Sequence, residues 1–407
     1  MSKPTKSKNG PPKPRAGAAS AAKGNSPPPV KAGAGEVEEL RRVLRERDLR
    51  ITKLRQRAAA LERRLARAES SSAEAAAPAS GQPALAAGSP PPFFIVGQAK
   101  SGTSWVMRLL EAHPEVMARG EGRFVGRSYK RPDLKRIDSA TLQPSSLQRA
   151  LLDADYLRAW IERSVWTREG DTEAALEELV GVCTRHIMHR ALEGSGKRLV
   201  GDKTPFLGAD AIVELASHFD DSQVIHVIRD GRDVAVSAMH HLWNHPLDLG
   251  GGLDLSSDES RIRERYRKDP QGFLESGKSI FTERRILALA SAWQSNVSRA
   301  IANGRDLLAD RYTEVRYERL VGEPIAETQR LLAAVGADAR PNLAARCVER
   351  ARFERFSGGR PVGTEDSTAF TRKGIVGDWM AVFTERDRRL FEEEAGELLT
   401  ELGYSSG

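Results

Sequence analysis

Short apolar runs alternate with longer helical patterns from residue 93 to residue 404. This alternation is typical of a parallel sheet covered by helices, because strands that are buried on both faces are apolar throughout. We therefore predict an α/β fold, a mostly parallel sheet flanked by helices, as one domain over residues 93–404. The predicted strands are residues 93–97, 198–201, 224–228 and 313–317. The predicted helices are residues 104–112, 174–193, 209–218, 231–241, 282–303, 324–335 and 385–402.

A different pattern, a seven-residue repeat, occupies residues 36–69. Nine of its ten core positions are apolar, as a coiled-coil seam requires. We predict a coiled coil that makes the chain a homo-oligomer, a dimer or a trimer. The alternative is a single amphipathic helix packed on its own domain, although residues 70–92, rich in Pro, Ala, Gly and Ser, are predicted to form a flexible linker. The core positions are Val37, Leu40, Leu44, Arg47, Ile51, Leu54, Ala58, Leu61, Leu65 and Ala68.

Residues 1–35 hold seven basic residues, no acidic ones and hardly any large apolar side chain. Such a segment buries too little surface to offset its ordering entropy, so we predict a disordered basic tail. The tail either remains solvated or adheres weakly to polyanions.

The charge of the whole chain, +7, is concentrated before the predicted domain. Residues 1–92 carry a net +10, which leaves −3 for the remainder. The domain therefore has no broad basic face, and no nucleic-acid partner is expected. Cys183 and Cys347 lie far apart in sequence, which argues against a disulfide framework and against a cluster of soft metal ligands. With neither a membrane-spanning apolar run nor a signal peptide, we expect a cytoplasmic protein.

At residues 93–105 a buried strand runs into a turn rich in Gly, Ser and Thr and then into a helix. Backbone N–H groups of such a turn and the positive end of the helix dipole favour an anion there. Gly97 and Gly102 keep the spacing of a P-loop, but Thr103 stands where the nucleoside-triphosphate loop has its Lys, which comes earlier, as Lys100. This predicts a P-loop-like fold that takes a single 5′-phosphate; the alternative is a glycine-rich turn with no nucleotide role.

Two other segments supply cations and a hydroxyl that suit a second phosphate. Residues 224–237 contain Arg229 and Ser237, and residues 372–379 begin with Arg372. Two guanidinium groups and a hydroxyl suit a doubly charged phosphate monoester. One Arg alone would be more typical of a surface ion pair, so the combination is what indicates a nucleotide.

Together these segments resemble the PAPS-dependent sulfotransferases, where PAPS is 3′-phosphoadenosine-5′-phosphosulfate. Residues 100–105 are similar to the 5′-phosphosulfate loop of that family, residues 224–237 to its 3′-phosphate strand and helix, and residues 372–379 to its closing R-K-G-x-x-G-D-W loop. The resemblance implies a sulfotransferase with PAPS as co-substrate, and places Trp105 and Tyr317 at the adenine. The donor-binding residues that it implies are Lys100, Ser101, Gly102, Thr103, Ser104, Trp105, Arg229, Ser237, Tyr317, Arg372, Lys373 and Gly374.

Sulfuryl transfer needs an in-line acceptor, a base, and positive charge at the leaving oxygen. Lys100 is the predicted cation for that oxygen. Relatives that act on phenols and steroids carry a His after a Lys-Thr pair, but Pro205 follows Lys203 and Thr204 here. In this respect the chain resembles the tyrosylprotein and glycosaminoglycan sulfotransferases, whose base is a Glu downstream of the loop cation. Glu121 lies at the matching separation.

The resemblance therefore implies Glu121 as general base and Lys203 as a second cation near the transferring group. Arg123 is expected to hold an acidic acceptor or to position Glu121. Without the resemblance, Glu121 would be interpreted as a surface carboxylate paired with Arg119 or Arg123.

Three histidines are weaker candidates. His113 is expected to cap or pack a helix end, and His240 and His241 are expected to be exposed, although His241 could face the acceptor. Residues 243–279 show little regular pattern and are predicted to be either an acceptor-side lid or a disordered surface segment.

Two other functions remain open from the sequence. One is a P-loop kinase or NTPase, disfavoured by the missing loop Lys before Ser104 and by Arg229 at the end of the central strand. The other is a catalytically inactive coiled-coil scaffold. No metal is expected, and the sequence does not name the hydroxyl-bearing or amine acceptor.

Overall fold

The computed structural model describes residues 89–126, 146–166, 171–205, 211–244, 255–366 and 372–404. The predicted basic tail, the predicted coiled coil and nearly all of the predicted linker lie outside these residues. Those predictions, and the oligomer that depends on them, stay predictions.

In the described part of the chain, five strands form one parallel sheet in the order β2-β3-β1-β4-β5. Every residue of β1, β3 and β4 is buried, which explains why the sequence shows them as apolar runs. The strands are β1 (Phe93–Gly97), β2 (Val116–Gly120), β3 (Leu199–Lys203), β4 (Val224–Ile228) and β5 (Tyr312–Arg316). The predicted P-loop-like α/β fold with a parallel sheet is confirmed.

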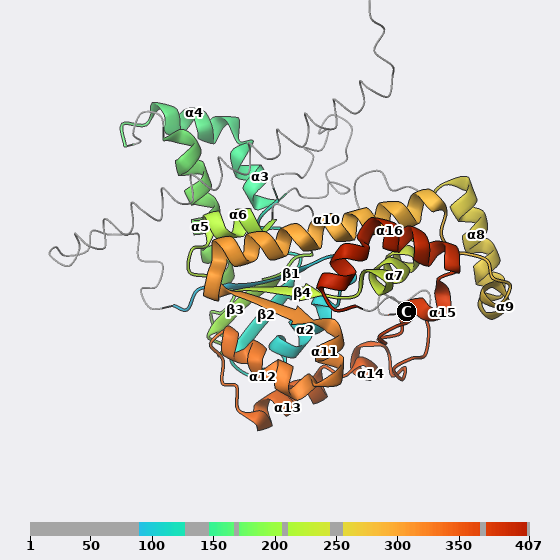
Figure 1. Cartoon of the computed structure of the whole chain (residues 1–407). Coiled ribbons are helices and arrows are strands. Elements are labelled where there is room, and N and C mark those ends of the chain that lie inside the picture. The colour runs from blue at the N-terminus through green and yellow to red at the C-terminus, as the bar shows by residue number, and fades with distance from the viewer. Residues whose placement is uncertain are drawn as a thin grey trace, which may run out of the picture. The chain divides into compact units, whose positions relative to one another are not determined.

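One face of the sheet is covered by α5 (Thr172–Arg190), α6 (Ala211–His218) and the long α10 (Glu283–Leu308), which runs across it in Figure 1. Phe94 and Val96 point to this face from the central strand. They pack with Ile212 and Leu215 of α6 and with Ala300 and Leu308 of α10.

The opposite face is covered by α2 (Thr103–Glu111), α11 (Tyr317–Gly322), α12 (Pro324–Ala334) and α13 (Pro341–Arg350) (Figure 1). Alternate residues of β1 point this way, because successive side chains of a strand face opposite sides. Ile95 packs there with apolar residues of all four helices.

A third cluster lies beside the sheet around the buried Trp293 of α10. It combines residues of α7 (Gly231–Asn244), which follows β4, with residues of α16 (Glu385–Glu401). This cluster attaches the C-terminal part of the chain to the helix that follows a central strand. The other helices that contribute to this cluster are α8 (Ser257–Lys268), α9 (Pro270–Glu275) and α15 (Trp379–Val382).

The remaining helices are short or peripheral: α3 (Leu147–Leu152), α4 (Asp155–Arg163) and α14 (Phe353–Phe356). Among the helices of the described residues, none is both long and apolar enough to cross a membrane.

The prediction that residues 243–279 lack regular structure is wrong over α8 and α9. Helix α8 begins with a capping box between Ser256 and Glu259, and Glu259 forms a buried ion pair with Arg285 of α10 at 2.6 Å. The pattern was missed because α8 is attached by this buried pair and by few apolar side chains, so the apolar stripe of an amphipathic helix is weak.

Candidate active site

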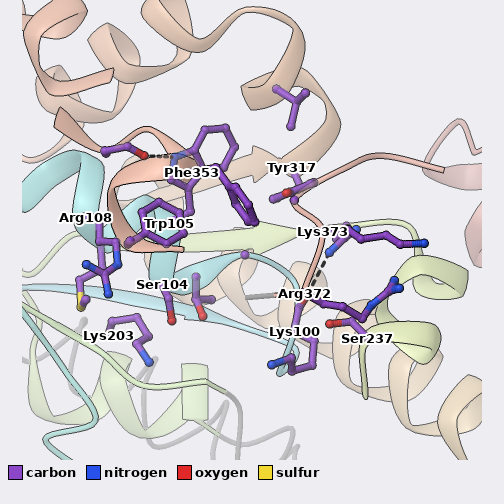
Figure 2. A pocket seen from close by; sticks show the side chains of 18 of the residues that line it. Lys100, Ser104, Trp105, Arg108, Lys203, Ser237, Tyr317, Phe353, Arg372 and Lys373 are labelled. Atoms are coloured by element: carbon purple, nitrogen blue, oxygen red, sulfur yellow. Dashed lines mark hydrogen bonds between the residues drawn. The ribbon is translucent and has the colours of Figure 1, made fainter. Parts of the chain in front are cut away.

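A cavity of about 820 Å³ opens at the carboxyl ends of the central strands (Figure 2). The predicted site residues come from β3, α2, α7, α11 and the loops around them, yet every one except Ser101 lines this single cavity. Those that line it are Lys100, Gly102, Thr103, Ser104, Trp105, Glu121, Lys203, Arg229, Ser237, Tyr317, Arg372, Lys373 and Gly374. In Figure 2, Ser237 and Arg372 lie to the right and Trp105 and Phe353 to the left.

The turn between β1 and α2 has the geometry of an anion site. Lys100 and Gly102 both have positive φ, 76° and 102°, so the turn curls sharply before the helix begins. Gly102 is the N-cap of α2 and provides no side-chain cap, so the first N–H groups of the helix are available for a ligand. A Cβ at Gly102 would lie 2.5 Å from the ring of Tyr317, so only glycine fits here. Ser101 points away into the core and is 1% exposed.

Positive charge is concentrated at Lys100. Burial, followed by the charges of Arg229 and Lys203, lowers the pKa of Lys100 from its ordinary value of 10.5 to about 8. A buried ammonium with other cations close by is unfavourable by itself and becomes favourable when an anion joins it. An anion bound beside Lys100 would therefore stabilise its charged form.

Arg229 is fixed from several sides. Its guanidinium donates to the carbonyl of Ile375 at 2.9 Å and to Asp233 at 3.2 Å, and lies 4.4 Å from the ring centroid of Tyr317. It also reaches the carbonyl of Lys100, 3.4 Å away. Among the described residues, no acceptor lies within hydrogen-bond distance of its Nε, although that atom is buried. A buried donor without an acceptor is costly, and a ligand oxygen would relieve the cost.

Asp233 attaches the C-terminal loop to α7. Its carboxylate accepts the backbone N–H groups of Gly377 at 2.9 Å and Trp379 at 3.0 Å, as well as the guanidinium of Arg229. Asp233 is only 1% exposed. This carboxylate therefore holds residues from two distant parts of the chain at one end of the cavity.

Arg372 and Lys373 enter the same end of the cavity from that loop. Lys373 pairs with Asp378 at 2.9 Å and with Glu365 at 3.0 Å, and Arg372 also contacts both carboxylates. Although burial alone would raise the pKa of Glu365, Arg372 and Lys373 hold it below its ordinary value. Among the described residues, the buried Nε of Arg372 has no acceptor.

Glu121 and Lys203 meet at the ends of β2 and β3. The ammonium of Lys203 donates to a carboxylate oxygen of Glu121 at 2.9 Å, and the backbone N–H of Glu121 donates to the carbonyl of Lys203 at 2.7 Å. The side chain of Lys203 is 5% exposed and that of Glu121 is 50% exposed. Arg123 lines the cavity next to them.

Aromatic side chains form one wall of the cavity. Trp105 and Tyr317 stand edge to face with their ring centroids 5.6 Å apart, and the indole N–H of Trp105 donates to the carbonyl of Ala351 at 3.1 Å. Phe353 of α14 also lines the cavity and was missed from the sequence. It packs so closely on Gly374 that a Cβ there would lie 2.7 Å from its ring, which ties the aromatic wall to the C-terminal loop.

The histidines differ in burial. His113 is 1% exposed and its Nδ1 accepts the N–H of Glu115 at 3.3 Å, as expected for a packing residue. The expectation that His240 is exposed is wrong: it packs between Trp243 and Tyr266, and burial, followed by the charge of Arg372, lowers its pKa to about 3. His241 is partly exposed and lines the cavity.

The model of the sulfotransferase family matches residues 91–341. This chain belongs to the sulfotransferase family. The match covers the anion-binding turn, Glu121, Lys203 and Arg229, and ends before the loop that carries Arg372.

Solved structures of sulfotransferases are similar to this chain at low identity. The sulfotransferase domain of the Synechococcus PCC 7002 olefin synthase is 17% identical, with 81% of this chain and 100% of that domain covered and a TM-score of 0.43. Mouse sulfotransferase SULT7A1, complexed with PAP, is 16% identical over 78% of this chain and 89% of its own, with a TM-score of 0.41. A sulfotransferase from Alicyclobacillus acidocaldarius is 19% identical over 67% of this chain and 99% of its own, with a TM-score of 0.33.

Within the residues that the structure describes, no three His, Cys, Asp or Glu side chains form a group that could hold a metal ion. The expectation that the chain needs no metal remains a prediction.

Proposed function

We propose that this chain transfers a sulfuryl group from PAPS to a hydroxyl or amine acceptor. The observation that carries the proposal is the cavity that joins Lys100, at the anion-binding turn, to Arg229 and Arg372, whose buried Nε atoms have no acceptor among the described residues. The anion-binding turn and the two guanidinium groups match a nucleotide that carries charge on both its 5′ and its 3′ side.

We propose one orientation for the donor in the cavity. Arg229, Arg372 and Ser237 would hold the 3′-phosphate, because two guanidinium groups and a hydroxyl can satisfy its oxygens. Trp105, with Tyr317 and the newly found Phe353 near it, would form the adenine site. The turn from Lys100 to Ser104 would hold the 5′-phosphosulfate at the N-terminus of α2. Ser101, Lys373 and Gly374 would shape the turn and the closing loop around these contacts.

The chemical step is an in-line displacement at sulfur. The acceptor oxygen forms a bond to sulfur while the bond from sulfur to the 5′-phosphate oxygen breaks, and 3′,5′-ADP takes the electron pair. Glu121 removes the acceptor proton as general base, and Lys100 stabilises the charge that develops on the leaving oxygen. Lys203 stabilises the transferring group and holds the carboxylate of Glu121, which it contacts at 2.9 Å.

The acceptor enters beside Glu121 and Arg123. Arg123 would hold an acidic group of the acceptor or help to orient Glu121. We also propose that the chain forms a homo-oligomer through residues 36–69 and that it is cytoplasmic.

Nucleotide titration of the purified chain tests the proposal. We expect tight binding of 3′,5′-ADP without magnesium, and release of 3′,5′-ADP when radiolabelled PAPS is incubated with phenols, sugars, lipids or tyrosine peptides. The same assay with EDTA tests whether a metal is needed. Magnesium-dependent binding of ATP, with no binding of 3′,5′-ADP, would instead support a kinase or NTPase.

A further inference from the structure

We propose that Asp202, the residue before Lys203 on β3, is a positioning residue for the general base. It holds the turn formed by residues 121–123, here called the base turn, and so sets where Glu121 and Arg123 enter the cavity. This inference rests on the proposed role of Glu121.

The base turn has an unfavourable backbone conformation. Glu121 and Arg123 both have positive φ, 64° and 50°, in the left-handed region. This conformation costs about 1–2 kcal/mol for each residue that is not glycine. Two such residues on either side of Gly122 persist only if neighbouring contacts hold them there. Glu121 and Arg123 both line the cavity.

Two adjacent residues of β3 supply the contacts. The Oδ1 atom of Asp202 accepts the backbone N–H of Gly122 at 2.9 Å, and the carbonyl of Lys203 accepts the N–H of Glu121 at 2.7 Å. The base turn therefore continues the register of the sheet, in which Arg119 pairs with Asp202 and Gly120 with Lys203. The side chain of Asp202 accepts one of these two backbone hydrogen bonds, and the ion pair of Glu121 with Lys203 is a third contact with β3.

Asp202 is itself fixed and buried. It is 3% exposed, and its second oxygen, Oδ2, accepts the hydroxyl of Thr204 at 2.6 Å. Burial raises the pKa of Asp202 above its ordinary value, although the hydrogen bonds from Thr204 and Gly122 oppose this. A carboxylate is costly to bury, so one kept at the end of a central strand needs donors such as these.

Gly122 shows how closely the base turn lies against Asp202. A Cβ at this position would come within 2.8 Å of Oδ1 of Asp202 and 2.4 Å of the ring of Phe124. The φ of Gly122 is not positive. A larger residue is therefore excluded by the lack of space and not by the backbone conformation. An alanine would therefore push the base turn away from the carboxylate.

The experiment compares Asp202→Ala, Asp202→Asn, Gly122→Ala and Glu121→Gln in the full chain. Asp202→Ala removes the acceptor for Gly122, and we expect kcat to fall about 10²-fold, because misplacement of a reacting group by about 1 Å has that effect. Asp202→Asn should restore most of the activity, since its oxygen still accepts from Gly122 and its amide can donate to the hydroxyl of Thr204. Gly122→Ala should also lower kcat, because the added methyl group would push the backbone of the base turn away from Asp202.

Binding of 3′,5′-ADP separates positioning from general damage. Because Glu121, Gly122 and Asp202 are not among the residues proposed to hold the nucleotide, all four variants should keep the affinity of the parent chain for 3′,5′-ADP, while the acceptor KM rises in Asp202→Ala. A matched control is Asp387→Ala, which removes another buried Asp, in the capping box of α16. It should lower the melting temperature and leave kcat of the folded protein unchanged.

Each failure has a distinct signature. If Glu121→Gln abolishes turnover while Asp202→Ala keeps the parent kcat, Asp202 does not position the base and the proposed function stands. If Glu121→Gln retains turnover, the proposed base is wrong and the inference about Asp202 is overturned with it. If Asp202→Ala does not fold, Gly122→Ala decides, and a parent-like kcat in that variant rejects the inference.

Discussion

The two ends of the cavity are built in different ways. At the end that we propose for the nucleotide, Arg229 is 11% exposed at its side chain and is held by Asp233, the carbonyl of Ile375 and the ring of Tyr317. At the end that we propose for the acceptor, the side chain of Glu121 is 50% exposed and stands on a turn with positive φ. The side chain of Arg229 is held by several contacts, whereas that of Glu121 is half exposed, so single substitutions should separate binding from chemistry.

The largest effect is expected at the acceptor end. Glu121→Gln removes the proton acceptor, and we expect kcat to fall by about 10²–10⁴-fold, the contribution typical of general base catalysis. Affinity for 3′,5′-ADP, measured by calorimetry, should not change. Glu193→Gln, at an exposed carboxylate, is the control and should behave as the parent chain does. Loss of nucleotide affinity in Glu121→Gln would remove the distinction between the two ends.

The next effect belongs to the nucleotide end. Arg229→Met should weaken binding of 3′,5′-ADP by about 1.5–3 kcal/mol, roughly 10- to 100-fold, the value of hydrogen bonds to a charged group. Binding of 5′-AMP should change much less, because that ligand lacks the 3′-phosphate. An equal loss for both nucleotides in calorimetric titrations would show that Arg229 does not recognise the 3′-phosphate.

The pH dependence of 3′,5′-ADP binding tests the role of Lys100. Its pKa of about 8 means that the ammonium is mostly charged at pH 7 and loses its proton as the pH rises through 8. The charged form attracts the anion, so affinity for 3′,5′-ADP should fall above pH 8, by up to about tenfold for each pH unit. The bound anion favours the charged form and raises the pKa of Lys100 in the complex, so the decrease continues up to that higher pKa. In Lys100→Met, this decrease in affinity above pH 8 should disappear. If the decrease persists, a group other than Lys100 causes it.

The smallest effect concerns the carboxylates that neutralise the closing loop. Glu365 lies 3.0 Å from Lys373 and 3.4 Å from Arg372, where it would compete with the proposed 3′-phosphate. Glu365→Gln should tighten 3′,5′-ADP binding by about 0.2–1 kcal/mol, the range of partly exposed ion pairs. Glu283→Gln, which breaks the exposed pair with Arg386, should have no effect. Weaker binding in Glu365→Gln would mean that Glu365 supports the loop instead.

The difference between the two ends also explains which parts of the site could be predicted from the sequence. The nucleotide end depends on local patterns, such as a buried strand followed by Lys100 and Gly102, which can be read without a structure. Strand β2 was missed because only its first three residues, Val116 to Ala118, are buried, too few for an apolar run. That strand carries the base turn, so its contact with Asp202 was not visible from the sequence.

Other features depend on tertiary contacts that leave little local signal. Helix α14 spans four residues, and the closeness of Phe353 to Gly374 follows from folding of the C-terminal loop. His240 looked like a surface residue because the aromatic side chains around it, Trp243 and Tyr266, come from two helices, of which α8 was not predicted. The predictions for residues 1–88 stay predictions.

Asp233 has a consequence for the order in which the protein matures during synthesis. The turn at Lys100 and the helix that carries Asp233 leave the ribosome well before the backbone N–H groups of Gly377 and Trp379, which that carboxylate accepts. In a nascent chain that ends before these residues, that carboxylate lacks the two N–H groups through which it holds the C-terminal loop at the cavity. The cavity is therefore complete only after synthesis has passed Trp379.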